Sequence, residues 1–231
     1  MEIIQHNERL RVQNIDYLTD DACSTTSKHG SLLPDVVRAV ITGASNSGKT
    51  NVLFNLITHQ NGLKFNNVYI FSKSLAQPKY QLLRKILSTV EGVKYFEFNS
   101  SENIIHPHEA LPYSVFVFDD VSCEKQTAVK EYFSYGRHHN IDVIYIGQTY
   151  SKISKQLLRD NLNLLIMFKQ DILNLKHIFN DHVSCDMSFE QFKTFCSMGW
   201  TEKYGFVVID KEKDVHSGRY RIGFDKFVLI R

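Results

Sequence analysis

The sequence predicts an α/β fold with a mostly parallel central sheet and helices on both of its faces. Short and nearly continuous apolar runs alternate with helix-compatible stretches along most of the chain, a pattern typical of parallel sheets that are covered on both faces. The length of 231 residues suits one such domain. A motif rich in glycine and serine, ending in Lys-Thr, stands between the first apolar run and the first helical stretch.

The strands and helices can be assigned in chain order. Buried strands are expected at residues 36–41, 67–72, 114–118, 142–146 and 164–168, with a short edge strand at 94–98. Helices are expected at residues 50–57, 81–89, 127–138, 176–181 and 188–198. Ser188 and Gln191 form a capping-box pattern at the start of the last helix. Residues 206–210 and 219–224 are expected to form a C-terminal β-hairpin.

The chain is expected to divide into an N-terminal arm or lead-in, residues 1–33, and one domain, residues 34–231. The first part is polar and contains a run of Asp, Ser and Thr residues, whereas the strand–helix alternation begins at Val36. The strand at 67–72 lies in sequence between the glycine-rich motif and the acidic pair that follows the strand at 114–118. We expect it to be an extra strand between those two strands in the sheet.

The glycine-rich motif is a full match to the phosphate-binding P-loop pattern G-x-x-x-x-G-K-[ST]. It consists of Gly43, Ala44, Ser45, Asn46, Ser47, Gly48, Lys49 and Thr50. The glycines allow backbone N–H groups to surround phosphate oxygens, and the N-terminus of the following helix adds partial positive charge. Lys49 is expected to reach the β- and γ-phosphates, and the Thr50 hydroxyl to hold a Mg²⁺ ion. The motif therefore predicts a P-loop NTPase that binds a nucleoside triphosphate.

An acidic pair, Asp119 and Asp120, follows the apolar strand at 114–118. In parallel sheets the ligand crevice lies at the carboxyl ends of the strands, where this pair is placed. Asp119 is expected to face the Mg²⁺ ion held by Thr50, directly or through water. Asp120 is expected to orient and deprotonate the attacking water.

A helix that ends near Arg137 is followed by a strand whose tip carries Gln148. An amide at that position could reach the γ-phosphate or its attacking water. This ordered set of motifs resembles the FtsK/HerA superfamily of DNA-pumping ATPases. Within it the chain is most similar to the poxvirus-type genome-packaging ATPases of large DNA viruses, virophages and Polinton-type elements. The resemblance covers roughly residues 36–168.

The resemblance implies that Arg137 is an arginine finger that enters the site of the neighbouring subunit. A planar, permanently charged guanidinium suits the negative charge of a phosphoryl-transfer transition state. Arg159, which precedes the strand at 164–168, is the competing candidate. FtsK-like pumps usually have Asp-Glu where this chain has Asp119-Asp120, so the expected base is one methylene shorter here.

Composition restricts the remaining possibilities. The formal net charge of +2 is too small to indicate a polyanion partner by itself, so a nucleic-acid surface would have to be local. Lys152 and Lys155 are possible DNA contacts by phosphate neutralisation, or simply part of a solvated surface. The four cysteines form no CxxC pair and no apolar run is long enough to span a membrane. We expect a soluble intracellular protein, located in the host cytoplasm or the virion if the source is viral.

The expected function is that of a ring-forming ATPase that uses ATP and Mg²⁺ to translocate double-stranded viral DNA into a capsid. Its expected partners would be duplex DNA of any sequence, further copies of itself and capsid proteins. One alternative with the same fold is a helicase-like or DNA-partitioning ATPase of a mobile element. An alternative of a different class is a nucleotide-dependent switch that binds partners without pumping.

Overall fold

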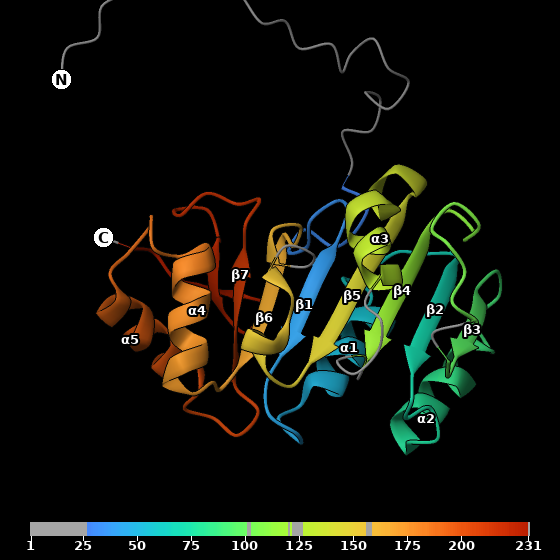
Figure 1. Cartoon of the computed structure of the whole chain (residues 1–231), viewed down its shortest axis with the longest axis horizontal. Helices are drawn as coiled ribbons and strands as arrows, with labels where there is room; N and C mark the ends of the chain where they lie inside the picture. Colours follow the sequence, from blue (N-terminus) through green and yellow to red (C-terminus); the bar gives the residue numbers. More distant parts are fainter. Residues whose placement is uncertain (1–26, 101–102, 120, 122–126, 156–158, 231) are drawn as a thin grey trace, which may run out of the picture.

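A single mixed sheet runs through the centre of the protein. The computed structural model describes residues 27–100, 103–119, 121, 127–155 and 159–230, and within these ranges nine strands form one sheet (Figure 1). The strands are β1 (Arg38–Thr42), β2 (Asn67–Ser72), β3 (Lys94–Phe98), β4 (Ser114–Asp119), β5 (Ile141–Gly147), β6 (Leu164–Phe168), β7 (Phe206–Asp210), β8 (Tyr220–Ile222) and β9 (Lys226–Phe227). Most of the arm expected over residues 1–33 lies outside the described ranges.

The order of the strands in the sheet is β3-β2-β4-β5-β1-β6-β7-β8-β9. All five pairings among β1 to β6 are parallel. The pairings β6–β7, β7–β8 and β8–β9 are antiparallel. The expectation of a mostly parallel sheet that ends in a C-terminal hairpin is therefore confirmed, and β9 adds a short strand beyond that hairpin.

One expectation about the sheet was wrong. A strand does separate β1 from β4, but it is β5, whereas β2 lies on the far side of β4. The reason is the right-handedness of parallel crossovers. The chain first moves outward from β1 to β2 and β3, with its helices on one face, and then returns through β4 and β5 with α3 (Thr127–Tyr135) on the other. The returning β5 fills the position next to β1.

The helices cover both faces of the sheet, as expected. Helices α1 (Lys49–Thr58) and α2 (Pro78–Leu87) pack on one face. Helices α3, α4 (Ile172–His182) and α5 (Phe189–Gly199) pack on the other. The capping box of Ser188 and Gln191 is present. Helix α4 begins four residues earlier than expected because the Asp171 side chain accepts a hydrogen bond from the Asn174 backbone and caps it. Helix α3 continues as a 3₁₀ turn, η4 (Gly136–His139).

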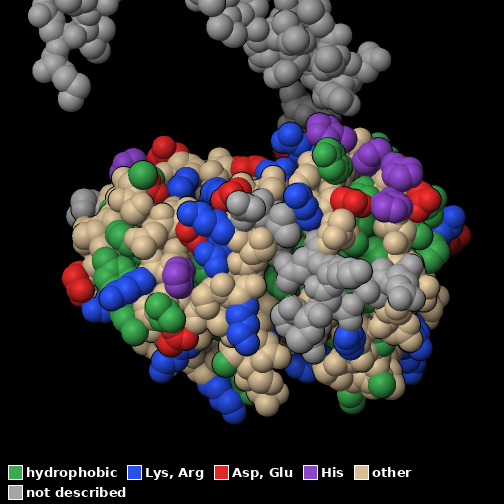
Figure 2. All heavy atoms as spheres, in the orientation of Figure 1, with side chains coloured by type: hydrophobic (Ala, Val, Ile, Leu, Met, Phe, Trp, Pro, Cys, Tyr) green, Lys and Arg blue, Asp and Glu red, His purple; other side chains and the backbone are tan. Residues whose placement is uncertain are grey.

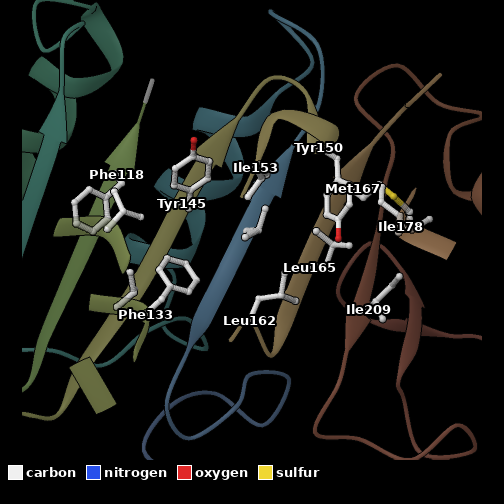
Figure 3. Close-up of a cluster of buried hydrophobic side chains, with 14 of the residues drawn as sticks. Phe118, Phe133, Tyr145, Tyr150, Ile153, Leu162, Leu165, Met167, Ile178 and Ile209 are labelled. Atoms are coloured by element: carbon white, nitrogen blue, oxygen red, sulfur yellow. The ribbon is translucent and has the colours of Figure 1, made fainter. Parts of the chain in front are cut away.

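Alternating residues of the strands supply the two hydrophobic layers. On β4, Phe116 and Phe118 belong to the layer beneath α3, whereas Val115 and Val117 belong to the layer beneath α1 and α2. Figure 3 shows the first layer, in which side chains of β4, β5, β6 and β7 meet those of the covering helices. The alternation places Asp119, two residues after Val117, toward α1 and α2. Among the described residues, no helix is both long and apolar enough to cross a membrane.

Candidate nucleotide-binding site

The P-loop connects the end of β1 to the start of α1, as its motif predicts. Gly48 is the N-cap of α1 and has φ of 114°, a conformation that side chains disfavour. Gly43 lies against β6, where an added Cβ would come within 2.6 Å of the Phe168 Cβ. Glycine at these two positions therefore allows both the turn into the helix and the close packing of the loop on the sheet.

The Lys49 ammonium folds back over its own loop. It donates hydrogen bonds to the carbonyl oxygens of Gly43 (2.6 Å) and Ala44 (2.7 Å). The Ser47 hydroxyl is buried and has no hydrogen-bond partner within the described part of the chain. A cation and an unsatisfied hydroxyl in a loop at a helix N-terminus fit an anionic ligand such as a polyphosphate.

Asp119 ends β4 beside the P-loop, and Tyr80 of α2 contacts it. The Tyr80 hydroxyl donates a hydrogen bond of 2.5 Å to Asp119 Oδ2. Tyr80 is only 1% exposed, and burial followed by the charge of Asp119 raises the pKa of its phenol. Asp120, the expected catalytic base, lies outside the described residues.

A cleft at the carboxyl edge of the sheet joins these groups. In Figure 1 the ends of β1, β2, β4 and β5 mark this edge at the lower side of the view. Its lining is polar and comes from the P-loop, β4, β5 and the segment that enters α2. The lining residues are Ser45, Asn46, Ser47, Gly48, Lys49, Thr50, Ser74, Gln77, Lys79, Asp119, Ile146, Gly147 and Gln148. Outside the P-loop, Asp119, Asp120 and Gln148 were expected at this cleft within one chain, and Arg137 or Arg159 was expected to act on the cleft of a neighbouring subunit. The cleft brings Asp119 and Gln148 together.

Thr50 and Asp119 both line the cleft. Hydroxyl and carboxylate oxygens are suitable ligands for Mg²⁺, which commonly keeps several waters and few protein ligands in nucleotide sites. The residues present therefore fit the expected ion.

The wall formed by the segment that enters α2 and by its first turn was not expected from the sequence. Ser74, Gln77 and Lys79 line the cleft, and Tyr80 lies directly behind it. The sequence signal was the strand at 67–72, because the carboxyl ends of parallel strands meet at one edge of a sheet. To place the residues after this strand at the cleft, one also has to know that β2 and β4 are neighbours, with Ser72 in register with Asp119.

Arg137 lies at the opposite edge of the sheet from the cleft. It is exposed in η4, just before β5 begins, whereas Gln148 follows the end of β5. A seven-residue strand separates them, which corresponds to roughly 23 Å at about 3.3 Å per residue. Arg137 therefore cannot reach the cleft of its own chain. Its surroundings include Arg38, Lys211, Asp160 and Glu212, which line a second cleft with it.

Arg159 is held inside its own chain. It is 7% exposed, and its guanidinium pairs with Asp181 at 2.9 Å. The same guanidinium donates to the carbonyl oxygens of Ile153 (2.9 Å) and Ser151 (3.0 Å). It also lies 4.6 Å from the centre of the Tyr150 ring. These contacts join η5 (Tyr150–Lys152) to α4.

The two lysines considered as DNA contacts are both exposed. The Lys155 ammonium lies 3.7 Å from Asp181, but its side chain remains 67% exposed. On the face seen in Figure 2, Lys and Arg side chains are interspersed with Asp and Glu. Neither lysine lines the nucleotide cleft.

Comparisons with known proteins agree with this architecture. Two solved structures of B204 share the fold. The genome packaging NTPase B204 of Sulfolobus turreted icosahedral virus 2, in complex with sulfate, has a TM-score of 0.56 and 17% identity, covering 85% of this chain and 98% of that one. The DNA-packaging ATPase B204 of Sulfolobus turreted icosahedral virus has a TM-score of 0.54 and 17% identity, covering 84% and 97%.

Sequence relatives point to one family. The chain is 27% identical over 136 residues to proteins of Variola virus and of Vaccinia virus (strain Copenhagen) that are named DNA packaging protein OPG160. The match covers 53% of this chain and 50% of each relative, so the chain spans about half the length of the curated relatives it matches. The family model described as Poxvirus A32 protein matches residues 25–211. This chain, matched over most of its length, belongs to the poxvirus A32 protein family.

Proposed function

We propose that the protein is an ATPase that forms a ring and translocates double-stranded DNA into a viral capsid. The observation that carries the proposal is the convergence of the P-loop, Asp119 and Gln148 on one polar cleft in a member of the A32 family. The relatives in poxviruses are named as DNA packaging proteins. The B204 proteins are described as genome-packaging or DNA-packaging NTPases, and one B204 structure holds ATP-γS.

In this proposal the P-loop holds the triphosphate. Lys49 exchanges its two carbonyl acceptors on the loop for the β- and γ-phosphate oxygens. Thr50 and Asp119 hold Mg²⁺, which when bound would offset negative charge on those oxygens. Asp120 accepts a proton from the attacking water, and Gln148 at the tip of β5 orients that water or contacts the γ-phosphate.

Arg137 is the proposed arginine finger, acting on the neighbouring subunit. Its exposure at the edge opposite the cleft supports this role, because a head-to-tail ring brings opposite edges of adjacent subunits together. The burial of Arg159 and its bonds to Asp181 and two backbone carbonyls favour a structural role for that residue. We therefore propose Arg137 in preference to Arg159.

Hydrolysis in the presence and absence of duplex DNA tests the proposal. Phosphate release from ATP should require Mg²⁺ and should increase when duplex DNA is added, whatever its sequence. The Lys49→Ala variant provides the baseline. An active ATPase that DNA does not stimulate would favour the alternative of a nucleotide-dependent switch that does not pump.

A further inference from the structure

The contact between Tyr80 and Asp119 joins α2 to the acidic residue of the nucleotide cleft. The phenol donates to Asp119 Oδ2 at 2.5 Å. Hydrogen bonds from a neutral donor to a carboxylate are shorter and stronger than bonds between neutral groups. A tyrosine that is 1% exposed has little rotational freedom, so this bond holds the carboxylate in one orientation.

The surroundings of Tyr80 keep its hydroxyl in place. Leu83 and Leu87 lie on the same buried face of α2. Ser72 is in register with Asp119 on the adjacent strand β2. Packing therefore holds the ring with its hydroxyl at the Asp119 carboxylate.

We propose that Tyr80 is a positioning residue that orients the Asp119 carboxylate for a divalent cation in the nucleotide cleft. This inference rests on the proposed nucleotide site, in which Thr50 and Asp119 hold Mg²⁺. A carboxylate has about four acceptor positions, and the bond from Tyr80 occupies one of them on Oδ2. The orientation of the remaining positions is then set before the cation arrives, which lowers the entropic cost of binding it.

The substitution Tyr80→Phe isolates the hydroxyl, because the ring and its packing are retained. We expect the Mg²⁺ concentration that gives half-maximal ATP hydrolysis to rise about 3- to 10-fold. This change is smaller than the full loss of a hydrogen bond to a charged group would cause, because Asp119 itself is retained. The rate at saturating Mg²⁺ should change little. Binding of a fluorescent ATP analogue in EDTA should be unchanged, since the phosphate contacts do not involve Tyr80.

Tyr132→Phe is the matched control. Tyr132 is also buried, and its hydroxyl donates to the Ile105 carbonyl at 2.9 Å beneath the helices on the opposite face of the sheet. Removing the Tyr132 hydroxyl eliminates a buried hydrogen bond but changes no residue that lines the cleft. The Mg²⁺ dependence of this variant should match that of the unmodified protein.

A double-mutant cycle tests whether Tyr80 acts through Asp119. In an Asp119→Ala background, Tyr80→Phe should cause no further change in metal affinity. The readout is Mn²⁺ binding, measured by electron paramagnetic resonance in the presence of a non-hydrolysable ATP analogue, so no turnover is needed.

Three results would overturn the role of Tyr80: an unchanged metal affinity in Tyr80→Phe, an equal change in Tyr132→Phe, or an undiminished effect in the Asp119→Ala background. These results are separate from a failure of the proposed function. A protein that binds Mn²⁺ with the analogue but hydrolyses no ATP would contradict the motor while leaving the Tyr80 measurement intact. A protein that binds no Mn²⁺ with the analogue would contradict both.

Discussion

The Lys49 ammonium donates hydrogen bonds to two carbonyl groups of its own loop. The phosphates of a bound nucleotide therefore have to replace these carbonyl groups as its acceptors. Replacing Lys49 by alanine removes the cation without disturbing a packed side chain, since Lys49 is only partly buried. We expect Lys49→Ala to lower ATP turnover by at least about 100-fold, in line with the loss of a phosphate-stabilising charge. Phosphate release is the measurement. The thermal unfolding midpoint should stay unchanged, and a large fall in that midpoint would show that the loss reflects unfolding.

Two arginines of this protein differ in what they contact. Arg159→Ala should lower the free energy of unfolding by about 3 kcal/mol, because it leaves the nearly buried Asp181 carboxylate without its closest cation. Arg137→Ala should change it by less than about 0.5 kcal/mol, as is usual for an exposed side chain. Urea unfolding followed by circular dichroism measures both. If Arg137→Ala were the destabilising change, Arg137 would be a structural residue and Arg159 the better candidate for the finger.

At the scale of elements, His182 connects the end of α4 to η5. Its Nε2 lies 2.7 Å from the Tyr150 hydroxyl. Burial, followed by the charge of Lys211, lowers the pKa of His182 from 6.5 to about 4. The charged groups around it are Lys211, Asp181, Arg159 and Arg219. The unfolded chain therefore binds a proton at higher pH than the folded chain does.

This difference predicts a pH dependence of stability. The contribution of neutral His182 to the free energy of unfolding is complete above pH 6.5 and is lost as the pH falls toward 4. A shift of this size corresponds to about 2 kcal/mol between pH 7.5 and pH 5. Urea unfolding at the two pH values measures it. His182→Gln, which cannot take up the proton, should show a smaller loss over the same interval. An equal loss in both proteins would assign the pH dependence to other groups.

At the scale of the whole molecule, the two edges of the sheet carry different parts of the proposed machinery. The nucleotide cleft lies at the carboxyl edge and Arg137 at the amino edge. A mixture of Lys49→Ala and Arg137→Ala subunits should therefore recover part of the ATPase activity that each variant lacks, because some interfaces pair an intact P-loop with an intact arginine. Light scattering must confirm mixed oligomers. No recovery at any ratio would contradict a role of Arg137 between subunits.

The charge of the molecule sets its expected behaviour toward DNA. With a formal net charge of +2, a single subunit should bind duplex DNA weakly, whereas the proposed ring would bring several copies of Lys152 and Lys155 around one channel. We expect binding that is independent of sequence and that weakens steeply with salt, as phosphate contacts do. Fluorescence anisotropy on two unrelated duplexes, with and without a non-hydrolysable ATP analogue, measures it. Strong preference for one duplex would contradict a pump.

Much of the fold was predictable because local patterns determine single elements. The bounds expected for β2, β3, β6 and β7 match the structure, since each is a compact apolar run with clear ends. Helix α2 begins at Pro78, three residues before the expected start, because proline is favoured in the first turn of a helix. Such errors at boundaries arise from single residues and do not change the architecture.

By itself, the sequence determined the P-loop, the position of Asp119 at the end of a buried strand and the placement of Arg137 and Gln148 at opposite ends of another. These are local relations, set by spacing along one strand or one turn. Only the tertiary structure decided that β5 lies between β1 and β4, that Arg159 is buried against Asp181, and that Tyr80 contacts Asp119 across 39 positions of the chain. Each of these depends on which strands become neighbours. The order of the strands follows from the handedness of the crossovers and from the burial of both faces of the sheet, and it cannot be predicted from a short stretch of sequence.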